Sequence, residues 1–411
     1  MEQSMNLAPE RTKKRKAPEE AHESSAFFLD DLNQDLLEGV LSWLPASSFF
    51  RLRSVCKRWS SIATSASFQL ACSKIPFRDP WFLMVDQHLD QSIVFDSSEW
   101  NWKSLSHPVY LQQNHGDKPI PVASSGGLIC YRTSSGEFIV CNPVTGACRR
   151  IPQVGLASES RNLHAIAMYS SPKDPSAYRI VLVLGEFSNL AFRVFDSNKG
   201  LWEEEAILAQ KAESSSESHM AGDETVYFLS KAGDVVASNM QRSPSKQYSS
   251  VLTMENGEEV VYFLSHSGTV VACNLARRTF VEHPRLLPLY FEYSIDVVEC
   301  DGEMLVVVLS EFLETASLRV WKFSKPDRSW QQVAAMPPAM SHEFYGKKVD
   351  INCIGHEDMI FICLNSSDFS SNIMCNVIKN QWVELPKCCV HGKAKEFMSA
   401  FSFEPRLEAS V

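Results

Sequence analysis

Histidine next to glutamate is the pairing in this sequence that comes nearest to a catalytic motif. His342-Glu343 and His356-Glu357 each begin the pattern H-E-x-x-H, in which two histidines one helical turn apart bind zinc and the glutamate acts as general base. The position of the second histidine is held by Gly346 in one case and by Ile360 in the other. Neither residue type binds a metal through its side chain, so neither pair predicts a zinc hydrolase.

The cysteines near the C-terminus were tested in the same way. Cys388, Cys389 and His391 are close in sequence, but C-C-x-H is not a spacing that zinc sites use. The sequence also has no G-x-S-x-G, no G-x-G-x-x-G and no P-loop. We therefore predict no catalytic residue, no metal site and no cofactor, and we look for the function in surfaces that bind other molecules.

The apolar helical segment 31–70 predicts such a surface. Its first run has apolar residues at helical spacing: Leu32, Leu36, Leu37, Val40, Leu41 and Leu44. Asn33 can cap this helix and Pro45 ends it. A second periodic run follows, at Phe49, Leu52, Val55, Cys56, Trp59 and Ile62. So short a segment cannot enclose a core of its own. We expect it to complete that core against a partner protein or, alternatively, against the rest of this chain.

The order of residues in this segment resembles the F-box. L-x-x-D-L-L-x-x-V-L-x-x-L-P begins at Leu32, and R-L-R-S-V-C-K-R-W-x-x-I ends at Ile62. The family usually has proline where this chain has Asn33, a good helix cap, so we expect the helix to start normally and adaptor binding to weaken. The resemblance implies docking on the Skp-type adaptor of a cullin–RING (SCF) ubiquitin ligase. The adaptor-binding residues that it implies are Leu32, Leu36, Leu44, Pro45, Val55, Cys56 and Trp59.

After residue 75, short β-branched and aromatic runs alternate with turn residues, a pattern typical of a barrel, a sandwich or a propeller. The predicted strands include 127–131, 137–141, 178–184, 226–229, 260–264, 304–309 and 359–364. No amphipathic helical pattern of comparable strength occurs in this part of the chain. The larger part of the protein is therefore predicted to be all-β.

A repeated motif favours the propeller. Three segments carry Asn, a bulky or sulfur residue six positions later and Pro at ten: Asn142–Cys148–Pro152, Asn274–Phe280–Pro284 and Asn376–Trp382–Pro386. Three others keep the first two positions: Asp96–Trp102, Asp196–Trp202 and Ser324–Trp330. A weaker seventh copy lies at Asn239, where residues 226–239 nearly repeat residues 261–274. The spacing is that of propeller blades.

The repeat unit resembles that of plant F-box/kelch proteins, most clearly over residues 124–152. The kelch double glycine occurs only at Gly126-Gly127. The resemblance implies a kelch-type β-propeller, and the motif copies leave six or seven blades open. We expect each aromatic anchor to fill the wedge between adjacent blades. We also expect the run around Phe401 and Phe403 to close the ring on the first blade, because closure removes two sheet edges.

Composition limits the classes of partner. The net charge is −10, and residues 1–30 and 31–70 contribute −1 and +1, so the β-rich part is acidic. Nucleic acid is therefore not the predicted primary ligand. No apolar run is long enough for a membrane span, and residues 1–25 lack the apolar core of a signal peptide. Twelve scattered cysteines without C-x-x-C predict reduced thiols in the nucleus or cytoplasm.

The N-terminal residues 1–28 are predicted to be a disordered tail, since they contain few large apolar residues. Lys13, Lys14, Arg15 and Lys16 form a basic cluster in this tail. Two readings stay open: a nuclear import signal or a solvated run of charge. The expected localisation is accordingly the nucleus, the cytoplasm or both.

The predicted organisation is a tail (1–28), the F-box (29–70), a short rigid linker (71–80), the propeller (81–405) and a C-terminal tail (406–411). The resemblance implies a non-catalytic substrate receptor of an SCF ligase, with propeller loops such as 156–164, 210–222 and 340–350 binding an unknown protein target. The first alternative is a scaffold or transcriptional co-regulator that does not direct degradation. The second is a propeller enzyme of the copper-oxidase kind, which would need a Tyr/His ligand set that the sequence does not single out.

Overall fold

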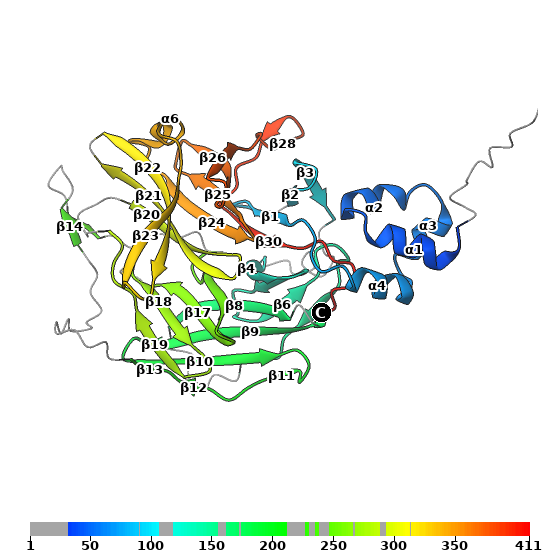
Figure 1. Cartoon of the computed structure of the whole chain (residues 1–411), viewed down its shortest axis with the longest axis horizontal. Coiled ribbons are helices and arrows are strands. Elements are labelled where there is room, and N and C mark those ends of the chain that lie inside the picture. The colour runs from blue at the N-terminus through cyan, green and yellow to red at the C-terminus, as the bar shows by residue number, and fades with distance from the viewer. Residues whose placement is uncertain are drawn as a thin grey trace, which may run out of the picture.

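The structure, a computed structural model, describes residues 32–89, 91–106, 118–154, 162–171, 174–211, 227–229, 235–237, 246–265, 268–287, 293–312 and 314–411. A small helical domain is followed by a large all-β domain, and the two lie side by side along the long axis of the molecule (Figure 1). No helix in these ranges is long and apolar enough to cross a membrane. The basic cluster at 13–16 lies outside the described residues.

Four short helices form the helical domain: α1 (Gln34–Ser42), α2 (Ala46–Leu52), α3 (Lys57–Ile62) and α4 (Ala66–Ser73). The predicted cap is confirmed, because the Asn33 side chain accepts a hydrogen bond from the Asp35 N–H at 3.4 Å. The second predicted run is not one helix: it is broken between α2 and α3. The domain continues past residue 70 into α4, so the connecting segment is shorter than predicted.

The all-β domain is a six-bladed propeller, each blade a four-stranded antiparallel sheet. From the innermost strand outward, the blades are as follows: blade 1, β30 (Ser399–Phe403), β1 (Trp81–Val85), β2 (Ser92–Asp96), β3 (Asn101–Leu105); blade 2, β4 (Ile120–Ser125), β5 (Leu128–Arg132), β6 (Phe138–Cys141), β7 (Cys148–Arg150); blade 3, β8 (Leu163–Ser171), β9 (Asp174–Glu186), β10 (Asn189–Asp196), β11 (Leu201–Trp202); blade 4, β16 (Ser250–Glu255), β17 (Glu258–Leu264), β18 (Val270–Asn274), β19 (Thr279–Glu282); blade 5, β20 (Tyr293–Cys300), β21 (Glu303–Phe312), β22 (Thr315–Ser324), β23 (Ser329–Ala335); blade 6, β24 (Asp350–His356), β25 (Met359–Asn365), β26 (Ser370–Asn376), β27 (Gln381–Glu384). The innermost strands contact one another in a closed circle, from β4 through β8, β16, β20, β24 and β30 back to β4.

The remaining short elements lie between the blades. They are β12 (Ala206–Ile207), β13 (Ala209–Gln210), β14 (Tyr227–Leu229), β15 (Val235–Ala237), α6 (Pro338–Ser341), η2 (His342–Phe344), β28 (Cys389–Val390) and β29 (Lys393–Ala394). The weak seventh copy of the repeat is β14 and β15, which pair with each other in the same register as the matching residues of β17 and β18. In the described residues this hairpin joins no blade, so the count is six.

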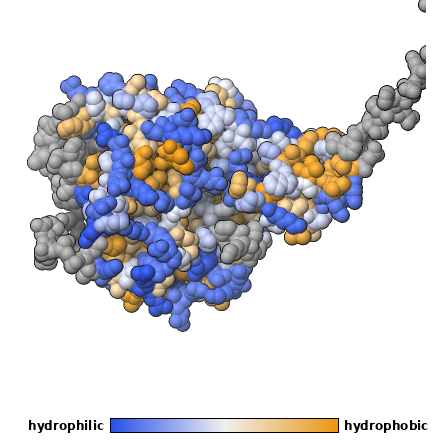
Figure 2. All heavy atoms as spheres, in the orientation of Figure 1, coloured by the Kyte–Doolittle hydropathy of each residue, from blue (hydrophilic) through white to orange (hydrophobic). Residues whose placement is uncertain are grey.

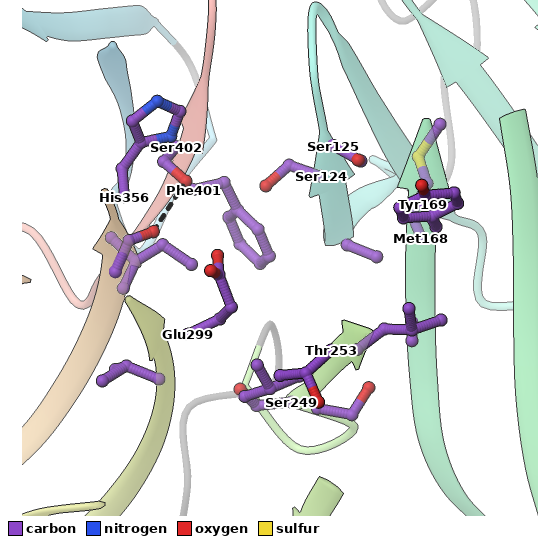
Figure 3. A pocket seen from close by; sticks show the side chains of 18 of the residues that line it. Ser124, Ser125, Met168, Tyr169, Ser249, Thr253, Glu299, His356, Phe401 and Ser402 are labelled. Carbon is purple, nitrogen blue, oxygen red and sulfur yellow. Dashed lines mark hydrogen bonds between the residues drawn. The ribbon is translucent and has the colours of Figure 1, made fainter. Parts of the chain in front are cut away.

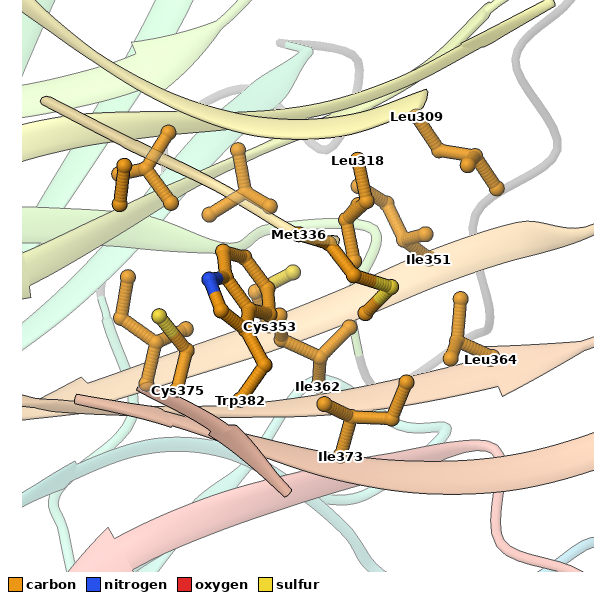
Figure 4. Close-up of a cluster of buried hydrophobic side chains, with 14 of the residues drawn as sticks. Leu309, Leu318, Met336, Ile351, Cys353, Ile362, Leu364, Ile373, Cys375 and Trp382 are labelled. Atoms are coloured by element: carbon orange, nitrogen blue, oxygen red, sulfur yellow. The ribbon is translucent and has the colours of Figure 1, made fainter. Parts of the chain in front are cut away.

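Six apolar clusters fill the six seams between neighbouring blades. Figure 4 shows the seam between blades 5 and 6, where Leu318 and Ile362 are fully buried and Trp382 is nearly so. The aromatic or sulfur anchor of each blade lies in the seam with the preceding blade, as predicted: Trp102, Cys148, Trp202, Phe280, Trp330 and Trp382.

The two forms of the repeat alternate around the ring. The Nε1–H groups of Trp102, Trp202 and Trp330 each donate to a proline carbonyl oxygen of the preceding blade at 2.7 Å, in Pro386, Pro152 and Pro284 respectively. Blades 1, 3 and 5 therefore supply the tryptophan, and blades 6, 2 and 4 supply the proline. The motif copies that lack proline in the sequence are the donors of this bond, and those with proline are its acceptors.

The predicted closure of the ring is confirmed. β30 pairs antiparallel with β1 from Trp81↔Phe403 to Val85↔Ser399. Residues 404–411 do not form a free tail, because Asn142 Nδ2 donates to the carbonyl oxygens of Arg406 and Ala409, both at 2.9 Å. A Cβ atom added to Gly127 would lie 2.7 Å from Ala409 Cβ. The double glycine thus makes room for the C-terminal residues.

One cysteine pair departs from the prediction of reduced thiols. Cys141 and Cys148 form a disulfide, because β6 and β7 pair in a register that sets them opposite each other with Cα atoms 4.1 Å apart. The other ten cysteines are free. Most of them are buried, and burial raises the pKa of the Cys72 and Cys388 thiols to about 11.

Candidate functional site

Helix α1 carries two apolar stripes. Leu37 and Leu41 face inward and are 1% and 3% exposed, whereas Leu36, Val40 and Trp43 are 60%, 56% and 70% exposed. These three residues recur at intervals of four and three, so they follow one face of the helix. Figure 2 shows hydrophobic atoms gathered on the helical domain, on the side away from the propeller. We call Leu36, Val40 and Trp43 the outer stripe.

The structure divides the predicted adaptor-binding residues into three groups. Leu36, Pro45 and Val55 are exposed. Leu32, Leu44 and Cys56 are half-buried and pack against the helical core. Trp59 is 7% exposed and belongs to that core. A direct contact between the Trp59 ring and a partner is therefore incorrect for this conformation, and its role is to support α1 and α4 from within.

Two members of the outer stripe, Val40 and Trp43, were not among the predicted contact residues. The signal was present, since α1 is apolar at Leu36, Leu37, Val40, Leu41, Trp43 and Leu44 and so has more apolar face than one core can cover. A helix that is apolar on two faces is buried on both in its functional state. One face is buried in the helical domain, and the other is open.

Helix α2 is fixed to the outer strands of blade 1 by a cluster of charges. Lys103 Nζ lies 2.7 Å from an Asp96 carboxylate oxygen and 2.6 Å from one of Glu99. The Ser47 hydroxyl donates to Asp96, and Arg51 pairs with Glu99. Burial alone would raise the pKa of Asp96, but hydrogen bonds from Lys103, Ser47 and Ser98 outweigh it and lower that pKa to about 2. Asp96 is thus ionised at neutral pH and holds the junction together.

A second set of contacts joins the helical domain to the C-terminal residues. Arg406 is 7% exposed, and its guanidinium donates to the carbonyl oxygens of Ile75 and Pro76 at 3.1 and 3.0 Å. It also pairs with Glu404 at 2.6 Å and Glu408 at 3.0 Å. Carbonyl groups in the connecting segment are therefore bound directly, which fits the predicted rigid linker.

Arg78 makes the reciprocal contact with the end of α1. Its guanidinium donates to the carbonyl oxygens of Ser42 at 2.9 Å and Leu44 at 3.2 Å, and its backbone N–H donates to Glu404 at 3.0 Å. The last carbonyl groups of a helix lack partners within the helix. Arg78 supplies those partners and thereby fixes the orientation of the outer stripe relative to the ring.

The two ends of the ring differ in what they carry. Strands alternate in direction within a blade, so turns after the first and third strands lie at one end and the remaining connections lie at the other. The helical domain and residues 404–411 lie at the first end, against Gly126, Asn142 and Glu99. The three predicted target loops connect a fourth strand to the next blade, so all of them belong to the opposite end. Of these loops, 340–350 is described in full, whereas 155–161 and 212–226 lie outside the described residues.

The channel inside the ring holds a cavity of about 310 Å³ (Figure 3). Its lining is mostly hydroxyl groups with Glu299 and His356, and the sticks in Figure 3 converge from all sides. Ser402 Oγ donates to the Gly355 carbonyl oxygen at 3.3 Å, so His356 does not activate it. Burial raises the pKa of Glu299 and lowers that of His356. Lys246, 2% exposed, donates to the Cys353 carbonyl oxygen at 2.6 Å.

The residues that the sequence singled out for chemistry are not brought together. His342 and Glu343 lie in η2, whereas His356 lies at the channel. Cys388 is buried in the seam between blades 6 and 1, and Cys389 and His391 are exposed. Among the described residues, no three His, Cys, Asp or Glu side chains are close enough together to hold a metal ion.

Comparison with known families matches both domains. Residues 29–70 match the F-box domain, and residues 94–378 match the KIB1-4 beta-propeller. The propeller model covers more than half of the chain. It is this type of propeller, rather than the kelch repeat, that the match identifies.

Comparison with curated proteins gives similar chains in Arabidopsis thaliana. The protein is 50% identical to F-box only protein 13 over 97% of this chain and 90% of that protein. It is 25% identical to F-box only protein 6, covering 87% and 69% of the two chains. It is 22% identical to Protein UNUSUAL FLORAL ORGANS, covering 92% and 85%. The chain therefore belongs to the plant F-box proteins that carry a KIB1-4 beta-propeller.

Proposed function

We propose that the protein is the substrate-recognition subunit of an SCF ubiquitin ligase. In this proposal the F-box binds the Skp-type adaptor, which brings the cullin and RING subunits, and the propeller binds a protein target. The observation that carries the proposal is the outer stripe: three large apolar side chains on one face of α1 are more than half exposed. Exposed apolar groups that follow one helix face are typical of a protein interface.

The two-part construction suits a receptor that works by placement. The contacts of Asp96, Arg78 and Arg406 hold the helical domain against the ring. A target bound to the propeller would then be held at a fixed distance from the charged ubiquitin-conjugating enzyme. Positioning raises the rate of such a transfer without any catalytic side chain of this protein. The protein is accordingly proposed to be non-catalytic.

The proposed target site is the end of the ring away from the F-box. Loops 156–164, 210–222 and 340–350 all belong to that end, and long connecting loops on a rigid scaffold commonly carry recognition. A target bound there would not compete with the adaptor for the helical domain. Nuclear and cytoplasmic localisation is part of the proposal, with Lys13 to Lys16 as the import signal.

The adaptor interaction can be tested with two leucines of nearly equal exposure. Leu36 in the outer stripe is 60% exposed and Leu70 in α4 is 61% exposed. Burying one leucine contributes about 1.5–3 kcal/mol, and each 1.4 kcal/mol changes affinity about tenfold. We expect Leu36→Glu to weaken binding of a purified plant Skp-type adaptor by at least about tenfold. Leu70→Glu is the matched control and should bind as the unmodified protein does.

Equal binding by both variants, or no binding by the unmodified protein, would contradict the proposal. A ubiquitylation assay on proteins captured by the propeller then separates degradation from scaffolding. Adaptor and cullin binding without ubiquitin transfer to any captured protein would favour the non-degradative alternative.

A further inference from the structure

One position of the repeat is apolar in four blades and polar in one. Immediately after the fourth strand, the backbone N–H bonds back to the start of the third strand in the same blade. This bond is made at 2.8–2.9 Å by Ile151, Leu208, His283, Met336 and Leu385, in blades 2 to 6. All five side chains are at most 7% exposed. Blade 4 thus places histidine where its neighbours place aliphatic core residues.

His283 is enclosed by aromatic rings. Its ring centroid lies 4.2 Å from that of Phe323, 6.0 Å from that of Tyr262 and 6.2 Å from that of Trp330. Burial, assisted by the charge of Lys325, lowers the pKa of His283 to about 4 against the opposing effect of Glu255. The imidazole is therefore neutral at physiological pH. Nothing in this apolar packing requires a polar ring.

The Nε2 atom of His283 is buried without a hydrogen-bond partner in the described structure. Leaving a buried polar atom unpaired costs about 1–3 kcal/mol. A leucine, as at Leu385, would avoid that cost at the equivalent place. An unpaired atom at a position that the repeat otherwise fills with apolar groups indicates that its partner is a bound molecule.

His283 lines a cavity of about 350 Å³ between blades 4 and 5, a volume near the lower limit for small-ligand sites. Its inner wall is apolar and is built from Val260, Tyr262, Ala272, Phe280, Val281 and Phe323. Charged residues form its rim: Lys211, Arg277, Lys325, Arg328, Glu255 and Glu258. The cavity therefore combines one open polar atom, an apolar wall and a charged entrance.

The entrance favours an anion. Both glutamates already have partners: Glu258 pairs with Arg277 at 2.7 Å, and Glu255 pairs with Lys325 and accepts from Tyr262. Four basic against two acidic side chains leave an excess of two positive charges around a neutral histidine. An oxyanion would accept a hydrogen bond from Nε2–H and meet this excess charge.

We propose that the cavity between blades 4 and 5 binds an oxyanion, phosphate or carboxylate, attached to a flat apolar group. The oxyanion contacts His283 and the basic rim, and the apolar group lies against the aromatic wall. The group could belong to a free small molecule or to a modified aromatic side chain of a protein. This site lies in the propeller, so the inference does not depend on adaptor binding.

The test uses the full-length protein with 13C-labelled histidine, whose eleven ring signals can be followed by NMR. The His283 signal is assigned by its loss in His283→Leu, which restores the residue type of blade 6. Inorganic phosphate, phenyl phosphate, benzoate and doubly capped phosphotyrosine are titrated. We expect phenyl phosphate or benzoate to shift the His283 signal selectively and to bind at least tenfold more tightly than inorganic phosphate.

The variants give the decisive readout. Calorimetry should show at least a tenfold loss of affinity for the same probe in His283→Leu, with a melting temperature equal to or above that of the unmodified protein. Lys211→Glu should also weaken binding, whereas Lys379→Glu, the same charge change on blade 6, should not. Tighter binding of capped phosphotyrosine than of phenyl phosphate assigns the site to a protein side chain, and the reverse order assigns it to a small molecule. Unchanged affinity in His283→Leu, or no selective shift with any probe, would overturn the proposal.

Discussion

The helical domain and the propeller dispose of their apolar residues in opposite ways. In the ring, residues such as Ile360, Ile362 and Val307 are 0% exposed, and the chain closes on itself through β30 and β1. In the helical domain, one stripe of α1 is buried and the next stripe, with Trp43 70% exposed, is open. The comparison teaches that the ring is complete as a folding unit, so its function lies in loops and cavities. The helical domain is incomplete, so its function lies in the surface it leaves open.

Removing the closing strand should break this contrast most severely. Deletion of residues 396–411 takes away β30 and with it the buried side chains of Phe397, Phe401 and Phe403. Each buried phenylalanine contributes about 1.5–3 kcal/mol, so we expect a loss of at least about 5 kcal/mol and no cooperative thermal unfolding of the propeller. Circular dichroism during heating measures this.

A control removes a similar feature that closes nothing. The β28–β29 hairpin pairs only with itself in the described structure. Replacing residues 390–393 by two glycines should leave the melting temperature within a few degrees of its original value. If the C-terminal deletion were equally mild, ring closure by β30 would not be the source of the propeller's stability.

The junction between the two regions depends on a buried charge. Arg406→Met leaves Glu404 and Glu408 without their partner, and breaking a buried ion pair costs about 3–5 kcal/mol. We expect limited proteolysis to cut near Pro76 in this variant. Arg51→Ala, which removes an arginine that is 66% exposed, should cost at most about 1 kcal/mol and leave that segment protected. Cleavage at the same rate in both variants would rule out Arg406 as the main link.

Acid should loosen the junction before it affects the apolar seams. The pKa of Asp96 is about 2 in the folded protein against 3.8 for the free side chain, so its stabilising effect is complete above pH 4 and is lost as pH falls from 4 to 2. A shift of this size corresponds to about 2 kcal/mol. Urea unfolding at pH 5 and pH 2.5 should show this loss, and Asp96→Asn should be less stable at pH 5 but lose less on acidification. Equal acid sensitivity of the two proteins would exclude Asp96 as its origin.

The smallest effect concerns the seams themselves. Trp202→Phe keeps an aromatic ring but removes the bond from Nε1 to the Pro152 carbonyl oxygen. We expect a loss of about 1 kcal/mol, measured as a shift of the urea midpoint. Trp100, 41% exposed, offers the matched change on a turn of blade 1, where Trp100→Phe should change stability by less than about 0.5 kcal/mol. Identical midpoints would show that the Trp–Pro bond adds nothing to the ring.

Sequence reasoning reached the features that local pattern determines. The Asn33 cap, the closing strand around Phe401 and the placement of the aromatic anchors between blades all follow from spacing and residue type. Spacing could not count the blades, because residues 226–239 copy a strand pair of blade 4 without forming the rest of a blade. The disulfide between Cys141 and Cys148 depends on the register of β6 and β7, which the spacing of seven residues does not reveal.

The candidate sites were harder to predict than the fold. Trp59 and Trp43 are both apolar residues of the F-box segment, and only the packing shows that the first is buried and the second exposed. His283 stands inside the Asn274–Pro284 motif, but its unusual character appears only when the structurally equivalent residues of other blades are aligned through their shared backbone bond. Burial and equivalence are properties of the assembled ring, not of any one segment.

The alternation of tryptophan and proline has a mechanical consequence. Three seams carry the Trp–Pro bond, so the ring behaves as three double blades joined at three weaker boundaries, one of which lies between blades 1 and 2. Ala46 of the helical domain and the last residues of the chain pack at that boundary. Any pull exerted on the F-box is therefore transmitted first to a joint that lacks a tryptophan brace, and the seated helices themselves reinforce it.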